Sequence, residues 1–143
     1  FLNKCIYKRI GIIGTTRTIE ENKFSSVNKE LVLKATPSFV PMIEDGSYKR
    51  KKDKIEAELE YFKDKVDCIV LGCTHYPLIH DTIDKYLHKP VLDMGILLCN
   101  SINLNSTSIS DRDVEIYFTK LDDKILEHCN KLIYGRKEIK EIK

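Results

Sequence analysis

The stretch 68–77, CIVLGCTHYP, constrains the fold of this chain more than any other. An apolar run of strand length, 68–71, ends at Gly72, and a thiol, a hydroxyl and an imidazole follow in succession at 73–75. Pro77 is typical of the first turn of a helix, because its ring fixes a helical φ angle and its missing N–H has no partner there. The sequence therefore predicts a strand, a polar turn that carries a thiol, and a helix.

The same alternation of strands and helices runs along the chain. Short apolar runs predict strands at 10–13, 31–33, 68–71, 91–92 and 114–118. Apolar residues recur at helical spacing between these runs, and Thr18 with Glu21 resembles a capping box at a helix start. Because alternating strands and helices build a mainly parallel sheet flanked by helices, the expected fold class is α/β.

Three further segments have patterns of their own. Pro37 and Pro41 predict irregular backbone over 36–46, a loop that would carry Glu44. The apolar run 96–104 is typical of a mostly buried helix. The charged residues 137–143 form no apolar stripe and predict a frayed tail.

Composition narrows the class of partner. The five cysteines lack paired close spacing, which favours reduced thiols, and no apolar run reaches membrane-spanning length, so we expect a cytoplasmic protein. The 24 Lys and Arg against 22 Asp and Glu leave a net charge of +2, too small to predict attraction to nucleic acid or to a membrane. The basic run 49–52 is short and lacks interleaved aromatic residues, so it predicts a solvated loop.

The thiol and the imidazole of the turn allow four interpretations. A hydrolase pair needs a base that contacts the nucleophile, and Cys73 and His75 would meet only in an unusual turn. A metal site would use Cys68, Cys73, His75 and His80, whose spacing is not that of a zinc site. The third interpretation is a buried structural cysteine. The fourth is a proton-transfer thiol, since a helix start or a neighbouring imidazolium favours the thiolate and ligands bind at the carboxyl ends of parallel strands.

Several segments resemble one family in order and spacing. LGCTHYPL at 71–78 is similar to the second catalytic motif of the cofactor-independent aspartate/glutamate racemase family. IGIIGT at 10–15 resembles the strand and turn that open its second domain, and FVPMIE at 39–44 resembles its acidic loop. The resemblance implies that 9–97 form the second α/β domain, and that 98–143 are the helix, strand and helix that return to the first domain.

The resemblance also implies a two-base reaction without a cofactor or a metal ion. One thiol removes the α-proton from one face of the amino acid, and a second thiol delivers a proton to the opposite face. Carried over to this chain, Cys73 is one acid/base, His75 polarises it or relays its proton, and Glu44 tunes His75. Thr74 and His75 bind the substrate, and Thr18 is a further substrate contact.

His75 favours glutamate as the substrate, because aspartate racemases usually carry an acid at this position. The implied activity is the interconversion of L- and D-glutamate for peptidoglycan synthesis, with a homodimer as a further expectation. The alternatives are a racemase of aspartate or another amino acid, and an inactive fragment or interaction module.

The chain begins at Phe1 and lacks the first half of the family, including the motif that supplies the second thiol. We therefore expect the carboxy-terminal part of a racemase, inactive on its own. The segment 99–101, CNS, resembles the missing motif only superficially, and its position after 93–95 favours Cys99 as a core residue.

Overall fold

A computed structural model describes residues 1–21, 24–102 and 114–142 of the chain. It divides into two units, Phe1–Ile102 and Asn103–Lys143. The sequence predicts a boundary after residue 97, which lies inside helix α5 (Met94–Ser101) of the first unit, and the assignment of the two parts to racemase domains stays a prediction. Among the described residues, no helix is both long enough and apolar enough to cross a membrane.

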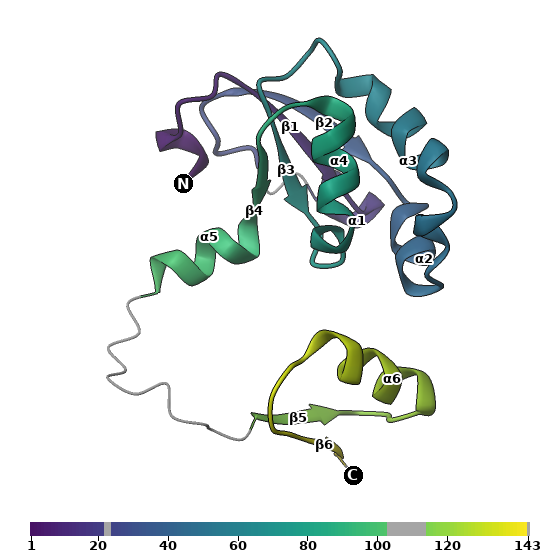
Figure 1. The fold of residues 1–143 in the computed structure, drawn as a ribbon. Helices are drawn as coiled ribbons and strands as arrows, with labels where there is room; N and C mark the ends of the chain where they lie inside the picture. Colours follow the sequence, from purple (N-terminus) through teal and green to yellow (C-terminus); the bar gives the residue numbers. More distant parts are fainter. Residues whose placement is uncertain (22–23, 103–113, 143) are drawn as a thin grey trace. The chain divides into compact units, whose positions relative to one another are not determined.

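The first unit is built on a four-stranded parallel sheet in the order β2-β1-β3-β4 (Figure 1). The strands are β1 (Arg9–Gly14), β2 (Glu30–Ala35), β3 (Cys68–Gly72) and β4 (Val91–Asp93). The strand predictions for this unit are confirmed, as is the parallel α/β class. Gly14 of β1 pairs with Gly72 on one side and with Ala35 on the other. Three strands therefore end at the same level, and their turns leave the same edge of the sheet.

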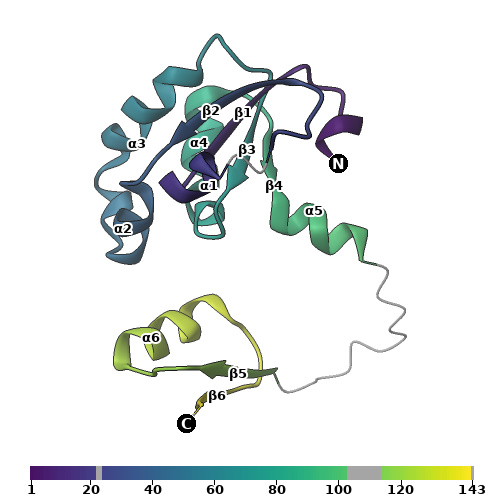
Figure 2. The same ribbon diagram turned by 180° about the vertical axis from the view of Figure 1, so that it is seen from behind.

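Helices cover the two faces of this sheet unequally. One face packs against α2 (Phe39–Glu44), α3 (Lys52–Leu59) and α4 (His80–Leu87), and α4 lies in front of the sheet in Figure 1. Figure 2 looks from behind, at the other face. On that face, a second hydrophobic cluster contains residues of η1 (Leu2–Lys4), α1 (Thr16–Glu20) and the first residue of α5. The short 3-10 turns η2, η3 and η4 cover Ser47–Lys49, Glu60–Phe62 and Tyr76–Ile79.

Two local predictions for this unit are wrong. The N-cap of α1 is Thr15 and not Thr18, because the hydroxyl of Thr15 accepts the backbone N–H of Thr18 at 3.2 Å. Residues 39–44 form α2 instead of an irregular loop. Pro41 lies in its first turn, where a missing N–H removes no helical hydrogen bond, so Glu44 is held at the end of a helix.

The expectation of a mostly buried helix after β4 is also wrong. Helix α5 is present, and the carboxylate of Asp93 caps it by accepting the N–H groups of Gly95 and Ile96. However, Ile96 and Leu98 are 59% and 61% exposed. Apolar composition predicts burial only where other elements cover the helix. Position 104, which is part of the same prediction, lies outside the described residues.

The second unit contains β5 (Val114–Phe118), α6 (Asp123–Leu132) and β6 (Lys137–Glu141). The strand prediction at 114–118 is confirmed, and Asp122 caps the helix by accepting the N–H of Ile125 at 2.9 Å. The predicted frayed tail is wrong, because 137–141 pair in parallel with β5 as β6. The backbone ladder to β5 orders a segment whose side-chain pattern alone does not indicate a strand.

Candidate active site

The end of β3 requires a glycine. A Cβ atom on Gly72 would lie 2.7 Å from the carbonyl oxygen of Ile13 on the neighbouring strand β1, which is closer than real Cβ contacts. The side chain at this position is therefore excluded by backbone, not by a movable neighbour. This close approach of two strands sets where the following turn begins.

The turn itself is tighter than the sequence predicts. The N–H of Tyr76 donates to the carbonyl oxygen of Cys73 at 3.2 Å, and the chain continues as the 3-10 turn η4. Helix α4 begins only at His80. The position of Pro77 predicts an α-helix directly after the turn. The thiol of Cys73 instead precedes a short 3-10 turn and does not lie at the N-terminus of an α-helix.

Cys73, His75 and Glu44 form a continuous line of contacts. The Sγ of Cys73 lies 3.8 Å from Nδ1 of His75, and Nε2 of the same ring lies 3.2 Å from Oε1 of Glu44. The turn closed by the N–H of Tyr76 and the carbonyl oxygen of Cys73 brings the thiol and the imidazole together, and it is the unusual turn that such a contact is expected to need. A carboxylate that accepts the Nε2 proton leaves Nδ1 as a proton acceptor that faces the thiol.

This line of contacts is open to solvent. The side chains of His75 and Glu44 are 39% and 62% exposed, and Cys73 is half-buried. An ion pair at such exposure contributes little to folding stability. Its effect is on the orientation of the imidazole, which places Nδ1 of His75 toward the thiol of Cys73.

A cavity of about 660 Å³ lies beside the thiol, in the size range of small-ligand sites. Cys73 and Thr74 line it, together with the junction of β4 and α5 (93–96) and Phe24. Sequence reasoning missed the junction, although the carboxyl end of the strand next to β3 is where such a wall belongs. Cys99 is exposed and lines the same cavity, so its expected role as a core residue is wrong.

Thr18 lies near the turn but is engaged elsewhere. Its methyl group would be 3.5 Å from a Cβ on Gly72. Its hydroxyl lies 2.8 Å from the hydroxyl of Thr15, within the cap of α1. The structure therefore brings Thr18 to the edge of the sheet where the other predicted site residues lie, while the described cavity wall does not include it.

Two buried groups, the thiol of Cys68 and the hydroxyl of Tyr76, stay protonated in the fold. Burial raises the pKa of the Cys68 thiol to about 12 and that of the Tyr76 hydroxyl to about 12. Cys68 is fully buried within β3. Across residues 1–21, 24–102 and 114–142, no cluster of three His, Cys, Asp or Glu side chains could hold a metal ion.

No protein-family model matches the chain. The glutamate racemase of Aquifex aeolicus (strain VF5) is 36% identical over 147 aligned residues, which cover 94% of this chain and 55% of that protein. The glutamate racemase of Aquifex pyrophilus is 34% identical over an alignment that covers 94% of this chain and 56% of that protein.

Solved structures agree with these relatives. Glutamate racemase from Francisella tularensis subsp. tularensis SCHU S4, in complex with D-glutamate, superposes with a TM-score of 0.76 and 26% identity over 95% of this chain and 57% of that chain. The Aquifex pyrophilus enzyme gives a TM-score of 0.65 and 30% identity over 98% and 58%. The chain spans about half the length of the curated relatives it matches. Within that span, the chain is similar to glutamate racemases in sequence and shares their fold.

Proposed function

We propose that this chain carries one acid/base half of a cofactor-independent racemase that interconverts L- and D-glutamate. The observation that carries the proposal is the line from Cys73 through His75 to Glu44 beside the cavity. The names of the relatives support glutamate as the amino acid, as does the D-glutamate complex of the Francisella enzyme.

In this proposal, Cys73 moves the α-proton. Its thiolate removes the proton from Cα, and the electron pair left on carbon delocalises into the adjacent carboxylate. The Nδ1 of His75 faces the sulfur and takes up or returns the thiol proton, while Glu44 holds the opposite edge of the ring. Thr74, on the cavity wall, binds the substrate through its hydroxyl and backbone N–H. Thr18 becomes a further substrate contact only when its hydroxyl leaves that of Thr15, which lies 2.8 Å away.

Inversion needs a second acid on the opposite face of the planar carbanion. The chain covers 55% of the Aquifex aeolicus relative, and we assign the second thiol to a part of the enzyme outside these 143 residues. The complete enzyme would act in the cytoplasm, as a homodimer, and supply D-glutamate for peptidoglycan. Cys99 lines the same cavity as Cys73, so the test must distinguish it from a second base.

The proposal is tested by hydrogen exchange in deuterated water. The 143-residue chain is incubated separately with L- and D-glutamate, and deuterium at Cα is followed by NMR together with the configuration of the product. A single base returns deuterium to the face from which it took the proton, so we expect exchange of one enantiomer with retention. Cys73→Ala should abolish this exchange, while the matched variant Cys99→Ala should leave it unchanged.

Other outcomes would contradict the proposal in different ways. Equal exchange by the unmodified chain and by Cys73→Ala would remove Cys73 from the reaction. Racemisation by the chain alone that is lost in Cys99→Ala would make Cys99 the second base. Faster exchange of aspartate than of glutamate would favour the alternative of an aspartate racemase.

A further inference from the structure

The buried hydroxyls of Thr36 and Tyr76 connect the ends of three strands. Thr36 follows β2, Tyr76 lies in the turn after β3, and both residues are 0% exposed. Their hydroxyl oxygens lie 2.8 Å apart. The hydroxyl of Tyr76 also lies 3.1 Å from the carbonyl oxygen of Thr36, and Oγ1 of Thr36 lies 3.3 Å from the carbonyl oxygen of Gly14 at the end of β1.

Each of the two hydroxyl protons has an acceptor in either arrangement. If Thr36 donates to Gly14, Tyr76 donates to Thr36. If Thr36 donates to the hydroxyl of Tyr76, that hydroxyl donates to the carbonyl oxygen of Thr36. Because a buried hydroxyl without a partner is unfavourable, the two residues hold each other in place.

Tyr76 is joined directly to the groups proposed for catalysis. It follows His75 in the chain, and its N–H donates to the carbonyl oxygen of Cys73 at 3.2 Å. Its ring packs edge to face on Phe39, with centroids 5.5 Å apart, and Phe39 begins the helix that ends at Glu44. Any shift of Tyr76 therefore moves the backbone that carries the thiol and the imidazole.

We propose that Thr36 and Tyr76 are positioning residues that fix the Cys73–His75 turn against the ends of β1 and β2. Neither hydroxyl touches substrate in this proposal; the pair acts through the separation of Sγ and Nδ1. It rests on the proposed role of Cys73, but the geometry of the turn can be measured without substrate.

The test is the alkylation of individual cysteines in the 143-residue chain. Tyr76→Phe and Thr36→Val each delete one hydroxyl and keep the shape of the side chain. Iodoacetamide labelling of Cys73 is followed by mass spectrometry from acidic to mildly alkaline pH, with half-buried Cys5 as the internal reference. Without the hydrogen bond, we expect the turn to hold Sγ of Cys73 near Nδ1 of His75 for a smaller fraction of the time. Cys73 should then react about three- to tenfold more slowly near neutral pH, which corresponds to the loss of one hydrogen bond. The pH profile of the alkylation of Cys73 should also shift. Thr36→Ser keeps the hydroxyl, so the rate and the pH profile of this variant should stay close to those of the unmodified chain.

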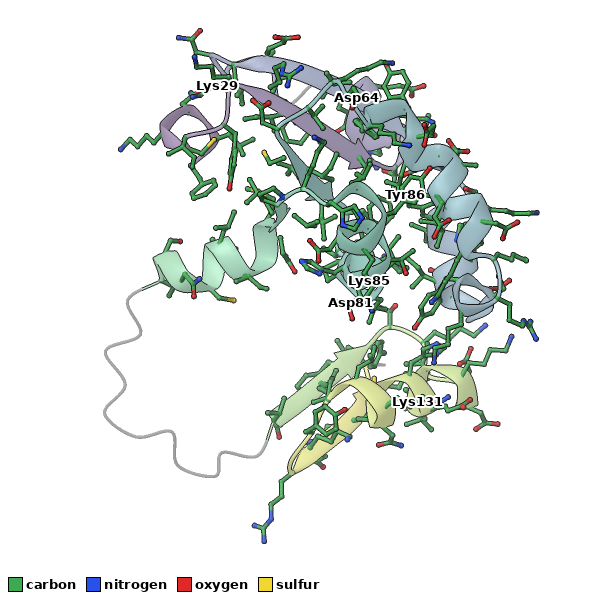
Figure 3. All side chains as sticks on the ribbon, turned by 45° about the horizontal axis from the view of Figure 1, so that its top comes forward. Lys29, Asp64, Asp81, Lys85, Tyr86 and Lys131 are labelled. Atoms are coloured by element: carbon green, nitrogen blue, oxygen red, sulfur yellow. The ribbon has the colours of Figure 1, made fainter. Side chains whose placement is uncertain are left out.

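The matched control is Tyr86→Phe. Tyr86 lies on α4 (Figure 3). Its hydroxyl donates to the carboxylate of Glu60, so this variant also deletes a tyrosine hydrogen bond. It should leave the rate and the pH profile of Cys73 unchanged.

Circular dichroism identifies the variants that fold. Folded Tyr76→Phe with the wild-type rate and pH profile at Cys73 would overturn the proposal. If Thr36→Val does not fold, Tyr76→Phe decides alone, since it retains the ring that packs on Phe39. Failure of the proposed racemase function would give a different result, namely no deuterium exchange while the alkylation of Cys73 still responds to Tyr76→Phe.

Discussion

The turns after β1 and β3 start from the same sequence pattern and end with different chemistry. Each follows a buried strand that closes on a glycine, and Gly14 and Gly72 lie opposite each other in the sheet. After β1, the hydroxyls of Thr15 and Thr18 bond to each other, and the first also caps α1. Those polar groups are satisfied within their own turn.

After β3, the polar groups reach beyond the turn. The imidazole of His75 contacts both the thiol of Cys73 and the carboxylate of Glu44 from another helix. The thiol also faces a cavity. The comparison shows that the end of a strand in a parallel sheet offers a place for a site. Polar groups that cap the following helix bond within their own turn, whereas uncapped polar groups can face a cavity and take part in a reaction.

The largest expected difference lies between Cys68 inside β3 and Cys73 in the turn that follows the strand. Burial raises the pKa of Cys68 to about 12, so its thiol stays protonated until the pH approaches that value. Because the thiolate is the reactive form, we expect Cys68 in the folded chain to react with iodoacetamide about 1000-fold or more slowly than half-buried Cys73 at mildly alkaline pH. Site-resolved mass spectrometry measures both rates in one sample. Similar rates would show that the end of β3 is not distinct from its interior.

A second experiment compares the two glycines. Gly72→Ala would place a Cβ against backbone of β1, and we expect a loss of about 3 kcal/mol of unfolding free energy. Gly14→Ala would place a Cβ 3.0 Å from Cγ2 and 3.1 Å from Cβ of Thr18. A small shift of α1 relieves both contacts, so the expected loss is about 1 kcal/mol. Urea unfolding followed by circular dichroism measures both. Equal losses would mean that the two strand ends are equally constrained.

A third experiment removes the cap after β1. Thr15→Ala deletes the hydroxyl that accepts the N–H of Thr18, and loss of such a cap typically costs about 1 kcal/mol. The same unfolding measurement detects it. The alkylation rate of Cys73 should not change, because the cap is confined to its own turn; a slower rate in Thr15→Ala would show that the two turns are coupled.

The smallest expected effect is at Glu44. Glu44→Gln removes the charge that faces Nε2 of His75 but keeps the length of the side chain. Since the pair is exposed, we expect the exchange of the substrate α-proton to slow only about two- to fivefold. NMR in deuterated water measures the change, with the exposed residue Glu127 on α6 as a matched site for Glu127→Gln. A loss as large as that of Cys73→Ala would instead make Glu44 indispensable to proton transfer.

The sequence predicted the strands well and the segments between them less well. Apolar runs located β1 to β4, because a buried strand in a parallel sheet is apolar on both faces. The alternating pattern of 114–118 located β5, whose residues are mostly exposed. Position-specific rules failed where tertiary context dominated. Pro41 predicts irregular backbone, but it lies in the first turn of α2, where a helix tolerates it. The charged segment 137–141 forms β6 because it pairs with β5.

The sequence by itself determined the class of fold, the order of the strands along the chain, and the string at 72–77 that resembles a racemase motif. Local apolar periodicity and turn chemistry encode these features, since they depend on neighbours within a few residues. The tertiary structure alone decided that Glu44 reaches His75, that Cys99 shares a cavity with Cys73, and that Thr36 bonds to Tyr76, 40 positions away. These contacts depend on strand register and on the path of each turn, which bring together residues whose spacing in the chain carries no record of their proximity.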